Sequence, residues 1–352
     1  MTLLAPGLHH PFETAPEPGA ATEIAPGILW MRLPLPMALD HVNVYALEDS
    51  SGWTLVDTGM MTRKTKALWE ALLTGPLAGK PVTRLIVTHH HPDHIGLAGW
   101  FQARGVELLI PRLPWLLARM LVLDVQDKPP VESQLFYQRA GVSAAMLAEK
   151  SAARPFNFAD CVAPLPLGFT RLSEGDILTA AGRRWQVRLG HGHAPDHATL
   201  WSLADGVVLG GDQLLPGISA NIGVYPTEPE ADPLGDWLTS TRGFQTHARN
   251  DQLILPGHKL PFTGLPFRLV QMAENHLFAL DRLQEHLAKP RRATECFAPL
   301  FRRQIGADQF GLALVEAVAH LNHLLRQGRI SRQLDSGGAW LWQAVEREHD
   351  QS

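Results

Sequence analysis

The sequence predicts a layered α/β fold followed by a smaller, mainly helical region. From residue 28 onwards, short apolar runs that end in turn residues alternate with helix-like segments, which is typical of α/β layers. A helix-rich stretch interrupts this alternation, and helices dominate again after about residue 265. At 352 residues the chain is long enough for one large domain and one smaller domain.

The elements before residue 112 follow from apolar periodicity and turn residues. Residues 1–27 are rich in Pro, Gly and Ala and predict an extended N-terminal arm. A Ser-Ser-Gly turn at Gly52 separates two strand-like segments. Expected next are strands 42–49 and 53–59, helix 62–73, strand 84–88, helix 94–105 and strand 106–111.

Residues 112–168 predict a helical insertion, which we expect to cap a pocket in a catalytic domain over residues 28–265. A peripheral packing layer without a pocket is the alternative. Short strands with clear turns return after the insertion. Residues 311–328 then predict a helix capped by its terminal glycine, and a hairpin turning at Gly337-Gly338 follows. Helices followed by a hairpin suggest a winged-helix-like domain over residues 266–352.

Composition and charge disfavour nucleic-acid-binding, disulfide-rich and membrane-spanning proteins. The net charge of −4 provides no general attraction for nucleic acid or acidic membranes. The two cysteines, Cys161 and Cys296, have no metal-binding or disulfide spacing. The N-terminus lacks the features of a signal peptide, and no run of about eighteen apolar residues predicts a membrane span. The expected location is the cytoplasm.

The stretch Arg84–Gly96, RLIVTHHHPDHIG, places four histidines and an aspartate within six positions. It follows an apolar strand, where α/β folds usually carry their functional groups. His89 and His91 can leave an extended backbone towards one side. After the turn at the proline, Asp93 and His94 offer a second pair. Imidazole and carboxylate groups are good ligands for first-row metals, zinc first among them.

Three further apolar strands end in residues of the same kind. They are followed by the segments HGHAPDH, GGD and PGH. The candidate ligands in these segments are His191, His193, His197, Asp212 and His258. Because four separate strand ends carry metal-binding residue types, the sequence predicts a metal centre at one edge of a sheet.

The segment THHHPDH fits the T-H-x-H-x-D-H signature, and the chain resembles the metallo-β-lactamase superfamily. The motifs LVDTG, THHHPDHIG, GHGHAPDH, LGGD and LPGH occur in the family's order over roughly residues 28–262. The resemblance implies a four-layer αββα sandwich with a metal centre at one sheet edge. The long C-terminal part resembles the lactamase-beta-2-like subgroup, whose members end in a winged-helix-like domain.

The resemblance also implies a role for each matching residue. One metal would be held by His89, His91 and His193, and the other by Asp93, His94 and His258. Asp212 would bridge the two ions. Asp57 would accept a hydrogen bond that braces the histidine loop.

Departures from the family pattern limit the resemblance. His191 stands where proline is usual in the third motif, and we expect it to point away from the metals. We explain the presence of His90 only by the alternation of side chains along the extended backbone between His89 and His91. Leu214 and Leu215 follow the bridging aspartate where quorum-type lactonases have a tyrosine, which weakens a lactonase interpretation. His91 replaces the glutamate of flavodiiron proteins, which disfavours an oxygen-reducing diiron centre.

The implied activity is hydrolysis by two divalent ions that share a bridging hydroxide. We expect Zn²⁺, with Mn²⁺ and Fe²⁺ as alternatives. Asp93 is assigned as the catalytic residue that orients the nucleophile and shuttles a proton. The expected substrate is an ester or thioester, including acyl-CoA-like compounds.

The helical insertion offers side chains for an acyl pocket. The candidate substrate contacts are Trp115, Leu116, Met120, Phe136 and Tyr137, together with His197 and Lys259. The alternatives are a phosphodiesterase or endoribonuclease, a lactonase, and a catalytically silent regulator. Seven arginines give the C-terminal region local basic character, but scattered arginines are typical of a solvated face. We therefore expect a small-molecule substrate, no nucleic acid and no membrane partner, and we leave a homodimer open.

Overall fold

The computed structural model describes residues 7–345. Residues 1–6 of the expected arm and residues 346–352 of the expected C-terminal domain lie outside the described residues. The chain forms two compact units. The first contains the residues up to Val125, Phe156–Ala220 and Gly243–Leu269, and the second contains Gln126–Pro155, Asn221–Arg242 and the residues from Val270 on. Each unit is described by itself below.

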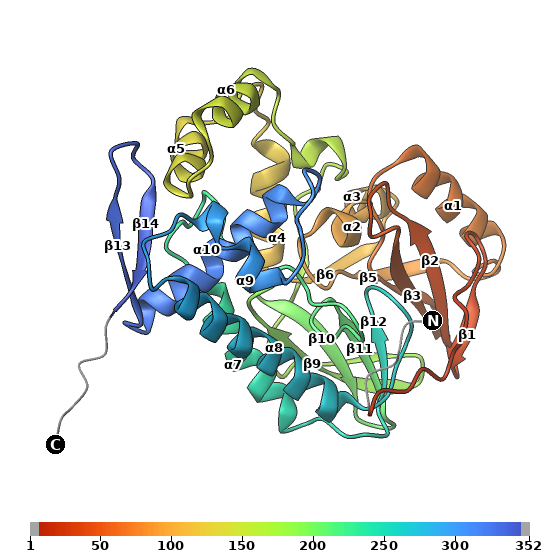
Figure 1. Ribbon diagram of the computed structural model, residues 1–352. Coiled ribbons are helices and arrows are strands. Elements are labelled where there is room, and N and C mark those ends of the chain that lie inside the picture. Colours follow the sequence, from red (N-terminus) through yellow and green to blue (C-terminus); the bar gives the residue numbers. More distant parts are fainter. Residues whose placement is uncertain (1–6, 346–352) are drawn as a thin grey trace. The chain divides into compact units, whose positions relative to one another are not determined.

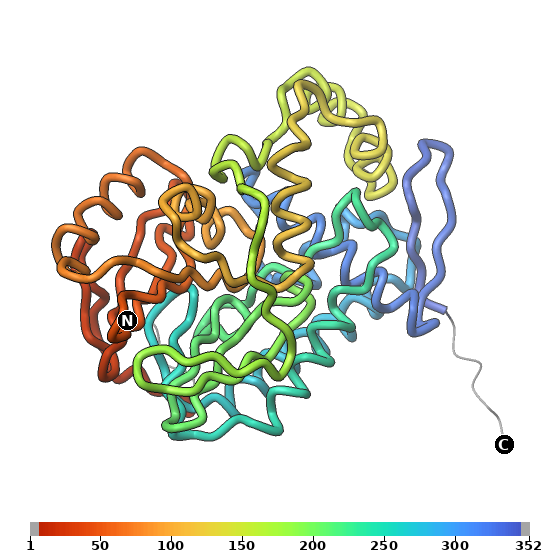
Figure 2. Tube along the Cα trace, turned by 180° about the vertical axis from the view of Figure 1, so that it is seen from behind, coloured from red at the N-terminus to blue at the C-terminus, as the bar shows by residue number. Residues whose placement is uncertain are grey.

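Two β-sheets form the centre of the first unit (Figure 1). The strands of the seven-stranded sheet, in spatial order, are β1 (Thr22–Ala25), β2 (Ile28–Pro34), β3 (His41–Asp49), β4 (Gly52–Val56), β5 (Val82–Ile86), β6 (Glu107–Pro111) and β7 (Thr170–Leu172). Those of the five-stranded sheet are β12 (Leu253–Pro256), β11 (Val207–Gly211), β10 (His197–Ser202), β9 (Arg183–Gly190) and β8 (Ile177–Ala180). Figure 2 shows that the red and orange part of the chain builds most of the first sheet, and the green to teal part builds the second.

The directions of the strands determine which strand ends share an edge. Strands β4 to β7 run parallel to one another, whereas β1 to β4 alternate in direction. In the second sheet, β11 and β12 are parallel, and β9 runs in the same direction because β10 is antiparallel to both β9 and β11. The carboxyl ends of β9, β11 and β12 therefore lie at one edge.

A buried apolar core joins the inner faces of the two sheets. Trp30 and Ile86 contribute from the first sheet, and Trp185 and Val187 from the second. In β9 these two residues alternate with less buried ones, as expected for a strand with one face in a core.

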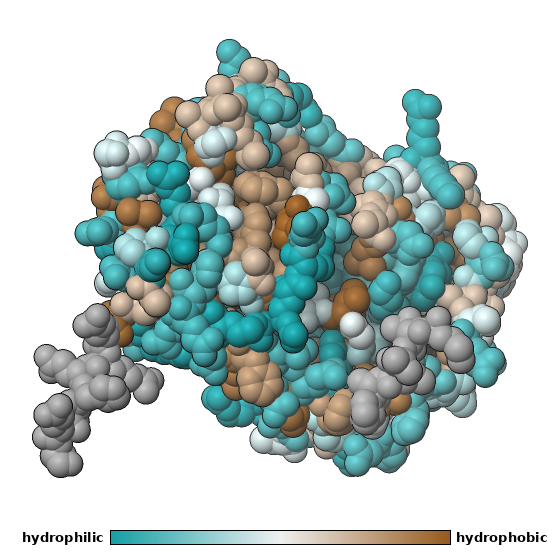
Figure 3. Space-filling view, in the orientation of Figure 1, coloured by the Kyte–Doolittle hydropathy of each residue, from teal (hydrophilic) through white to brown (hydrophobic). Residues whose placement is uncertain are grey.

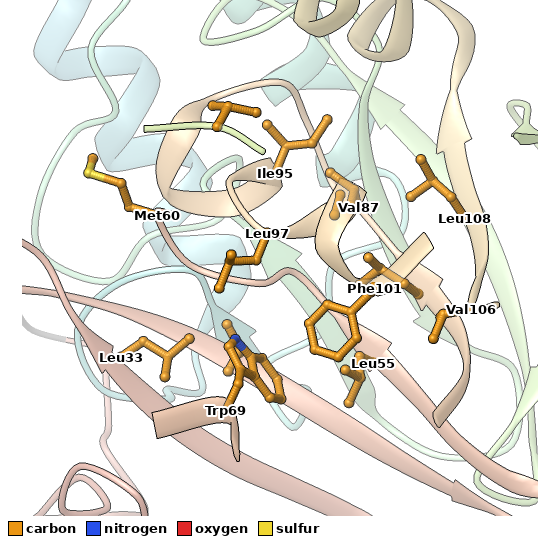
Figure 4. Packing of buried hydrophobic residues seen from close by; sticks show 14 of the residues in the cluster. Leu33, Leu55, Met60, Trp69, Val87, Ile95, Leu97, Phe101, Val106 and Leu108 are labelled. Carbon is orange, nitrogen blue, oxygen red and sulfur yellow. The ribbon is translucent and has the colours of Figure 1, made fainter. Parts of the chain in front are cut away.

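Helices cover the outer face of each sheet. Helices α1 (Arg63–Thr74), α3 (Ala98–Gln102) and α4 (Arg112–Leu123) supply buried residues to a second core on the first sheet. Trp69 packs edge-on against Phe101 in this core, with 5.1 Å between ring centroids (Figure 4). On the second sheet, Phe244, in the last turn of α7 (Pro233–Gln245) and itself part of the first unit, stacks on Trp201. The expected αββα sandwich is thus present, although α7 was not predicted.

The expected helix over 94–105 is instead two short helices, α2 (Pro92–Ile95) and α3. The Thr58 hydroxyl accepts a hydrogen bond from the Leu97 amide (3.0 Å) and donates one to the His94 carbonyl (2.8 Å). A side chain from another strand end therefore takes the backbone groups that a continuous helix would pair. Gly96 also lies so close to the backbone of Gly59 that an added Cβ would be 2.5 Å from its carbonyl oxygen.

The described part of the arm packs onto the first unit. Strand β1 pairs with β2, His9 forms a β-bridge with Thr263, and Phe12 contacts Trp30 at 6.3 Å between centroids. Its extended backbone is therefore held by the sheet and the core.

The expected insertion 112–168 divides between the two units. Helix α4 belongs to the first unit because Trp115, Ala118 and Val122 lie in its outer core. Helices α5 (Val131–Arg139) and α6 (Ala144–Ala152) belong to the second, where Gln138 donates a hydrogen bond to the Gly337 carbonyl (3.0 Å).

The second unit otherwise consists of helices followed by a hairpin. Its C-terminal elements are most of α8 (Leu265–His286), η2 (Ala293–Glu295), α9 (Phe297–Phe301), α10 (Phe310–Arg326), β13 (Ile330–Leu334) and β14 (Trp340–Ala344). The predicted hairpin is confirmed, with Gly338 at a positive φ of 80° in its turn. The boundary expected at residue 265 differs, because residues 221–242 cluster with this unit. One reason is that the Asn322 amide on α10 donates to the carbonyls of Pro229 and Ala231.

The surface is largely polar on the face drawn in Figure 3, where hydrophobic residues are interspersed among hydrophilic ones. Among the helices of residues 7–345, none combines the length and apolar character that crossing a membrane requires.

We predict that Trp69→Phe lowers the free energy of unfolding by about 1–3 kcal/mol, because it leaves a buried carbonyl without its donor. The Trp69 indole N–H donates to the Thr58 carbonyl at 2.7 Å, and Phe preserves most of the packing. Urea denaturation measures the change. Trp100→Phe, at a half-buried position on α3, is the control and should have a smaller effect. Equal losses for the two variants would contradict the role given to this hydrogen bond.

Candidate metal centre

The expected ligands follow four strand ends of the first unit, and Asp57, expected to brace the histidine loop, follows a fifth. Asp57 follows β4, the histidine loop follows β5, His193 follows β9, Asp212 follows β11 and His258 follows β12. The parallel directions within each sheet bring these ends to common edges, which is why residues far apart in the sequence meet here.

His89, His91 and His193 form one group of facing ring nitrogens. The distances are 3.0 Å from His89 Nε2 to His91 Nδ1 and 3.0 Å from His91 Nδ1 to His193 Nε2. Nitrogen lone pairs directed at a common point form a ligand set suited to Zn²⁺.

Asp93, His94 and His258 form a second group. Asp93 Oδ2 lies 3.4 Å from His258 Nε2 and 3.6 Å from His94 Nε2. The mixture of imidazole and carboxylate donors again suits a first-row divalent ion.

Asp212 faces both groups. Its Oδ2 is 3.4 Å from His193 Nε2 and 3.2 Å from His258 Nε2, and its Oδ1 is 3.4 Å from His94 Nε2. Gly257 permits this approach, because a Cβ there would lie within 3 Å of both Asp212 and His94. The residue that the resemblance implied as a bridge is therefore the one within reach of both groups.

Two buried atoms test whether these residues fit a metal. His94 Nε2 and Asp212 Oδ1 are fully buried and have no hydrogen-bond partner among residues 7–345. Buried polar atoms are almost always paired, so two such atoms facing each other need another explanation. A divalent cation would satisfy both, and the donor set fits one.

The Asp57 carboxylate braces the histidine loop. It accepts hydrogen bonds from the Thr88 amide (2.8 Å) and from His94 Nδ1 (2.8 Å). With Nδ1 committed to Asp57, the lone pair of His94 lies on Nε2 and faces the second group. Asp57 has a φ of 61°, a conformation that aspartate adopts rarely and that persists only when its surroundings enforce it.

Strand β3 braces His258, a role that the sequence analysis did not find. His258 Nδ1 donates to the His41 carbonyl at 2.7 Å, which leaves Nε2 for a ligand. The Asn43 amide donates to the carbonyls of Pro256 and Lys259, on either side of His258. A polar Asn43 within an apolar strand was the available signal.

The remaining histidines of the motifs do not join the two groups. The His197 ring has no exposed surface, stacks on His89 at 4.6 Å between centroids and accepts a hydrogen bond from the Asp212 amide (3.1 Å). It is thus a positioning residue rather than a substrate contact. His191 is half-exposed and contacts Asp196, and His90 stacks on Phe158.

The aromatic residues expected to contact substrate belong to both units. Trp115 is buried in the first unit and stacks on Phe169 at 4.7 Å. Phe136 lies in the second unit, where it lines a pocket of about 330 Å³. Tyr137 is its neighbour on α5, and Lys259 is half-buried beside His258.

The charges of the two groups are complementary. Burial would raise the pKa of the Asp212 carboxyl, but the adjacent His258 and His94 rings hold it well below its ordinary value. Burial would likewise lower the pKa of His258, but the Asp212 carboxylate raises it to about 9. Burial and neighbouring imidazoles hold the pKa values of His89 and His91 well below the ordinary value. The neighbouring carboxylates thus raise the pKa values of both His94 and His258, so a proton on either ring would compete with a cation for the same nitrogen.

Sequence comparison identifies two regions of the chain. Residues 37–258 match the metallo-beta-lactamase superfamily, and residues 280–345 match the metallo-beta-lactamase-like C-terminal domain. A probable metallo-hydrolase of Bacillus subtilis (strain 168), YqjP, is 26% identical over 309 residues, which cover 84% of this chain and 92% of that protein.

Two solved structures are similar over most of their length. A beta-lactamase domain protein from Burkholderia ambifaria is 35% identical with a TM-score of 0.87, covering 96% of this chain and 98% of that one. The metallo-beta-lactamase family protein TTHA1429 from Thermus thermophilus is 26% identical with a TM-score of 0.76, covering 92% and 100%.

We predict that the apparent affinity for Zn²⁺ rises between about pH 6.5 and 9. His258 keeps its proton up to about pH 9 in the folded metal-free protein, and only to about 6.5 in an unfolded chain. This proton stabilises the metal-free fold fully below pH 6.5, and the stabilisation is lost as the pH rises through 9. A cation must displace this proton from the folded protein, so binding strengthens as the pH rises towards 9, including the interval from 6.5 to 9.

Calorimetric titration in buffers of different ionisation enthalpy counts the protons released. Release should exceed one proton per centre at pH 7. His191→Asn removes a half-exposed histidine outside both groups and should leave the profile unchanged. An affinity independent of pH would show that His258 does not ligate the ion.

Proposed function

This chain belongs to the metallo-β-lactamase superfamily of metal-dependent hydrolases, and on that premise we propose that it hydrolyses an ester or thioester at a centre of two divalent ions. Acyl-CoA-like compounds fall within this substrate class. The ion we favour is Zn²⁺, since five of the seven donor residues are histidines.

The position of Asp212 is the observation that carries the binuclear proposal. Its two carboxylate oxygens face different histidines, His193 and His258 on one side and His94 on the other. A carboxylate within 3.4 Å of both groups is suited to two ions that act together.

Bound divalent ions lower the pKa of water towards neutrality and polarise the oxygen of a carbonyl or phosphoryl group. The chain's own residues must then position the reactants and move the proton. Asp93 is suited to this task because its side chain keeps some exposed surface, whereas Asp212 is more deeply buried. Its low pKa, maintained against burial by His94 and His258, keeps it ionised to accept a proton and pass it to the leaving group.

The exposed face of α4 supports an acyl substrate. Trp115, Ala118 and Val122 turn one face of this helix into the core. The opposite face exposes four apolar residues at helical spacing, namely Leu113, Leu116, Met120 and Leu123. Helix α4 contacts the short η1 helix (Phe158–Asp160), and Phe158 stacks on His90, next to the ligand His91. Helix α4 is thus linked through η1 to the histidine loop, and its exposed apolar face is our candidate surface for an acyl chain.

The phosphodiesterase alternative has less support. An RNA platform needs free basic side chains, but several C-terminal arginines are paired with acids. Arg292 pairs with Asp335, Arg329 with Asp281 and Arg332 with Glu230, all in the second unit. The lactonase alternative lacks its tyrosine, because Leu214 and Leu215 stand where that residue is expected. Both leucines are buried. A silent regulator would not require the complete donor set.

A hydrolysis panel tests the substrate class directly. Zinc-loaded protein should cleave acyl thioesters or esters, and it should be much slower on lactones, phosphodiesters and RNA. Preference for the phosphodiesters or for RNA would replace the proposal with its alternative.

We predict that His193→Ala lowers the metal content by about one equivalent, and His193→Ala/His258→Ala by about two, because each change removes a ligand from one group. Elemental analysis after dialysis measures the difference from wild type. The matched control is His191→Ala, two residues from His193 and outside both groups, which should lose nothing. A loss of a single equivalent in the double variant would rule out two ions.

We also predict that Leu116→Ser and Met120→Ser raise KM about tenfold for long acyl chains and little for short ones. Burial of a Leu or Met side chain is worth about 1.5–3 kcal/mol, and about 1.4 kcal/mol is tenfold. Kinetics on a two- to twelve-carbon thioester series measures the effect. Leu203→Ser is the control, since this exposed leucine follows β10 at the end opposite the metal-ligand edge. A response independent of chain length would remove α4 from the substrate site.

A further inference from the structure

We propose that the second unit holds a metal site of its own, in which His276, Glu316 and His320 bind one divalent transition-metal ion, Zn²⁺ first. Their ligand atoms all lie within 4.8 Å of one another. None of the three residues takes part in the hydrolytic centre, so the proposal stands apart from the proposed function.

Two helices supply the three side chains. His276 lies on α8, and Glu316 and His320 lie on α10. The spacing of four residues places Glu316 and His320 on one face of α10, one turn apart. Both histidines are buried, whereas Glu316 is partly exposed, which leaves an approach for an ion from its side.

The nitrogen separation suits a common ion. His276 Nδ1 lies 3.2 Å from His320 Nε2. Two nitrogens bound tetrahedrally to zinc at the usual bond length are about 3.3 Å apart. The facing nitrogens of His89, His91 and His193 show a similar spacing of 3.0 Å.

The surrounding hydrogen bonds orient two of the ligands. His320 Nδ1 donates to the Glu316 carbonyl at 2.8 Å, so the lone pair of the neutral ring lies on Nε2 and faces His276. The Asn221 amide donates to Glu316 Oε2 at 2.9 Å and to the Leu312 carbonyl at 3.2 Å, and so holds the carboxylate. Partners of this kind, a backbone carbonyl on the histidine and a donor on the carboxylate, are typical around ligating residues.

A hydrogen bond between two neutral histidines is the competing explanation. Such a bond accounts for the 3.2 Å between His276 Nδ1 and His320 Nε2. It does not explain why the Glu316 carboxylate, held by Asn221, lies beside the two rings. Burial raises the pKa of Glu316 to about 7, so the ionised carboxylate beside two neutral rings needs a cation, and near neutral pH a proton is the alternative. A cation would neutralise Glu316 and join α8 to α10. Two imidazoles and one carboxylate favour a transition ion over Mg²⁺ or Ca²⁺.

The test uses full-length protein in which the hydrolytic centre has been disabled by His193→Ala/His258→Ala. Dialysed against trace Zn²⁺, this protein should retain about one equivalent more than its derivative that also carries Glu316→Gln or His276→Gln. Zinc should raise its Tm, and the added substitution should abolish the rise. In the otherwise wild-type chain, Glu316→Gln should lower the zinc content by about one equivalent and leave the hydrolytic rate unchanged.

His323→Gln is the matched control, because His323 is a buried histidine of the same helix that pairs with Asp232 instead. It should leave the zinc content unchanged. If His276→Gln does not fold, Glu316→Gln decides, since it preserves volume and keeps an oxygen for Asn221. Equal zinc content and equal thermal response with and without Glu316→Gln would overturn the proposal.

Discussion

The hydrolytic centre depends on the buried carboxylate of Asp57. This group links the end of β4 to the loop after β5 by accepting from Thr88 and His94. Without it, the His94 ring would lose the partner that fixes its tautomer, and the loop that supplies four candidate ligands would keep only its other anchors, such as the bond from Thr58 to the His94 carbonyl. The positive φ of Asp57 shows that the backbone accepts an unfavourable conformation to place this carboxylate.

The same principle extends to the other ligands. His258 is held by a carbonyl of β3, and Asp212 is positioned through its amide by His197. In His94 and His258 the bracing partner commits Nδ1, so Nε2 is the nitrogen that faces the candidate metal site. Because the partners lie on strands and strand ends of both sheets, formation of the sandwich and formation of the centre are one event.

Burial sets the electrostatics of the centre. Two carboxylates and five imidazoles share a small buried volume, which is unfavourable unless the charges balance. The carboxylates raise the pKa values of His94 and His258, so either a cation or protons on these rings would supply that balance. The His276, Glu316 and His320 cluster raises the same question in the second unit, with one carboxylate and two imidazoles. In both places, donors of a transition ion are gathered where water cannot stabilise a charge.

Part of this protein could be predicted from the sequence alone. Apolar periodicity and turn residues predicted most strands, the helix α10 and the C-terminal hairpin, because these signals act over a few neighbouring residues. The ordered motifs predicted the candidate ligand residues, since chemistry restricts metal binding to few side chains, and the structure brings these residues together. The expected helix over 94–105 was wrong, because the Thr58 hydroxyl, distant in sequence, takes its backbone groups.

Only the tertiary structure decided the rest. It assigned α4, with Trp115, to the first unit and α5, with Phe136, to the second, and it placed the apolar face of α4 in the outer core of the first unit. It also assigned His41 and Asn43 to the support of His258, and brought His276 to Glu316 and His320. No local pattern carries these facts. The sequence by itself determined which side chains could bind a metal, and the tertiary structure decided which of them meet, because meeting depends on strand order and helix packing over long separations.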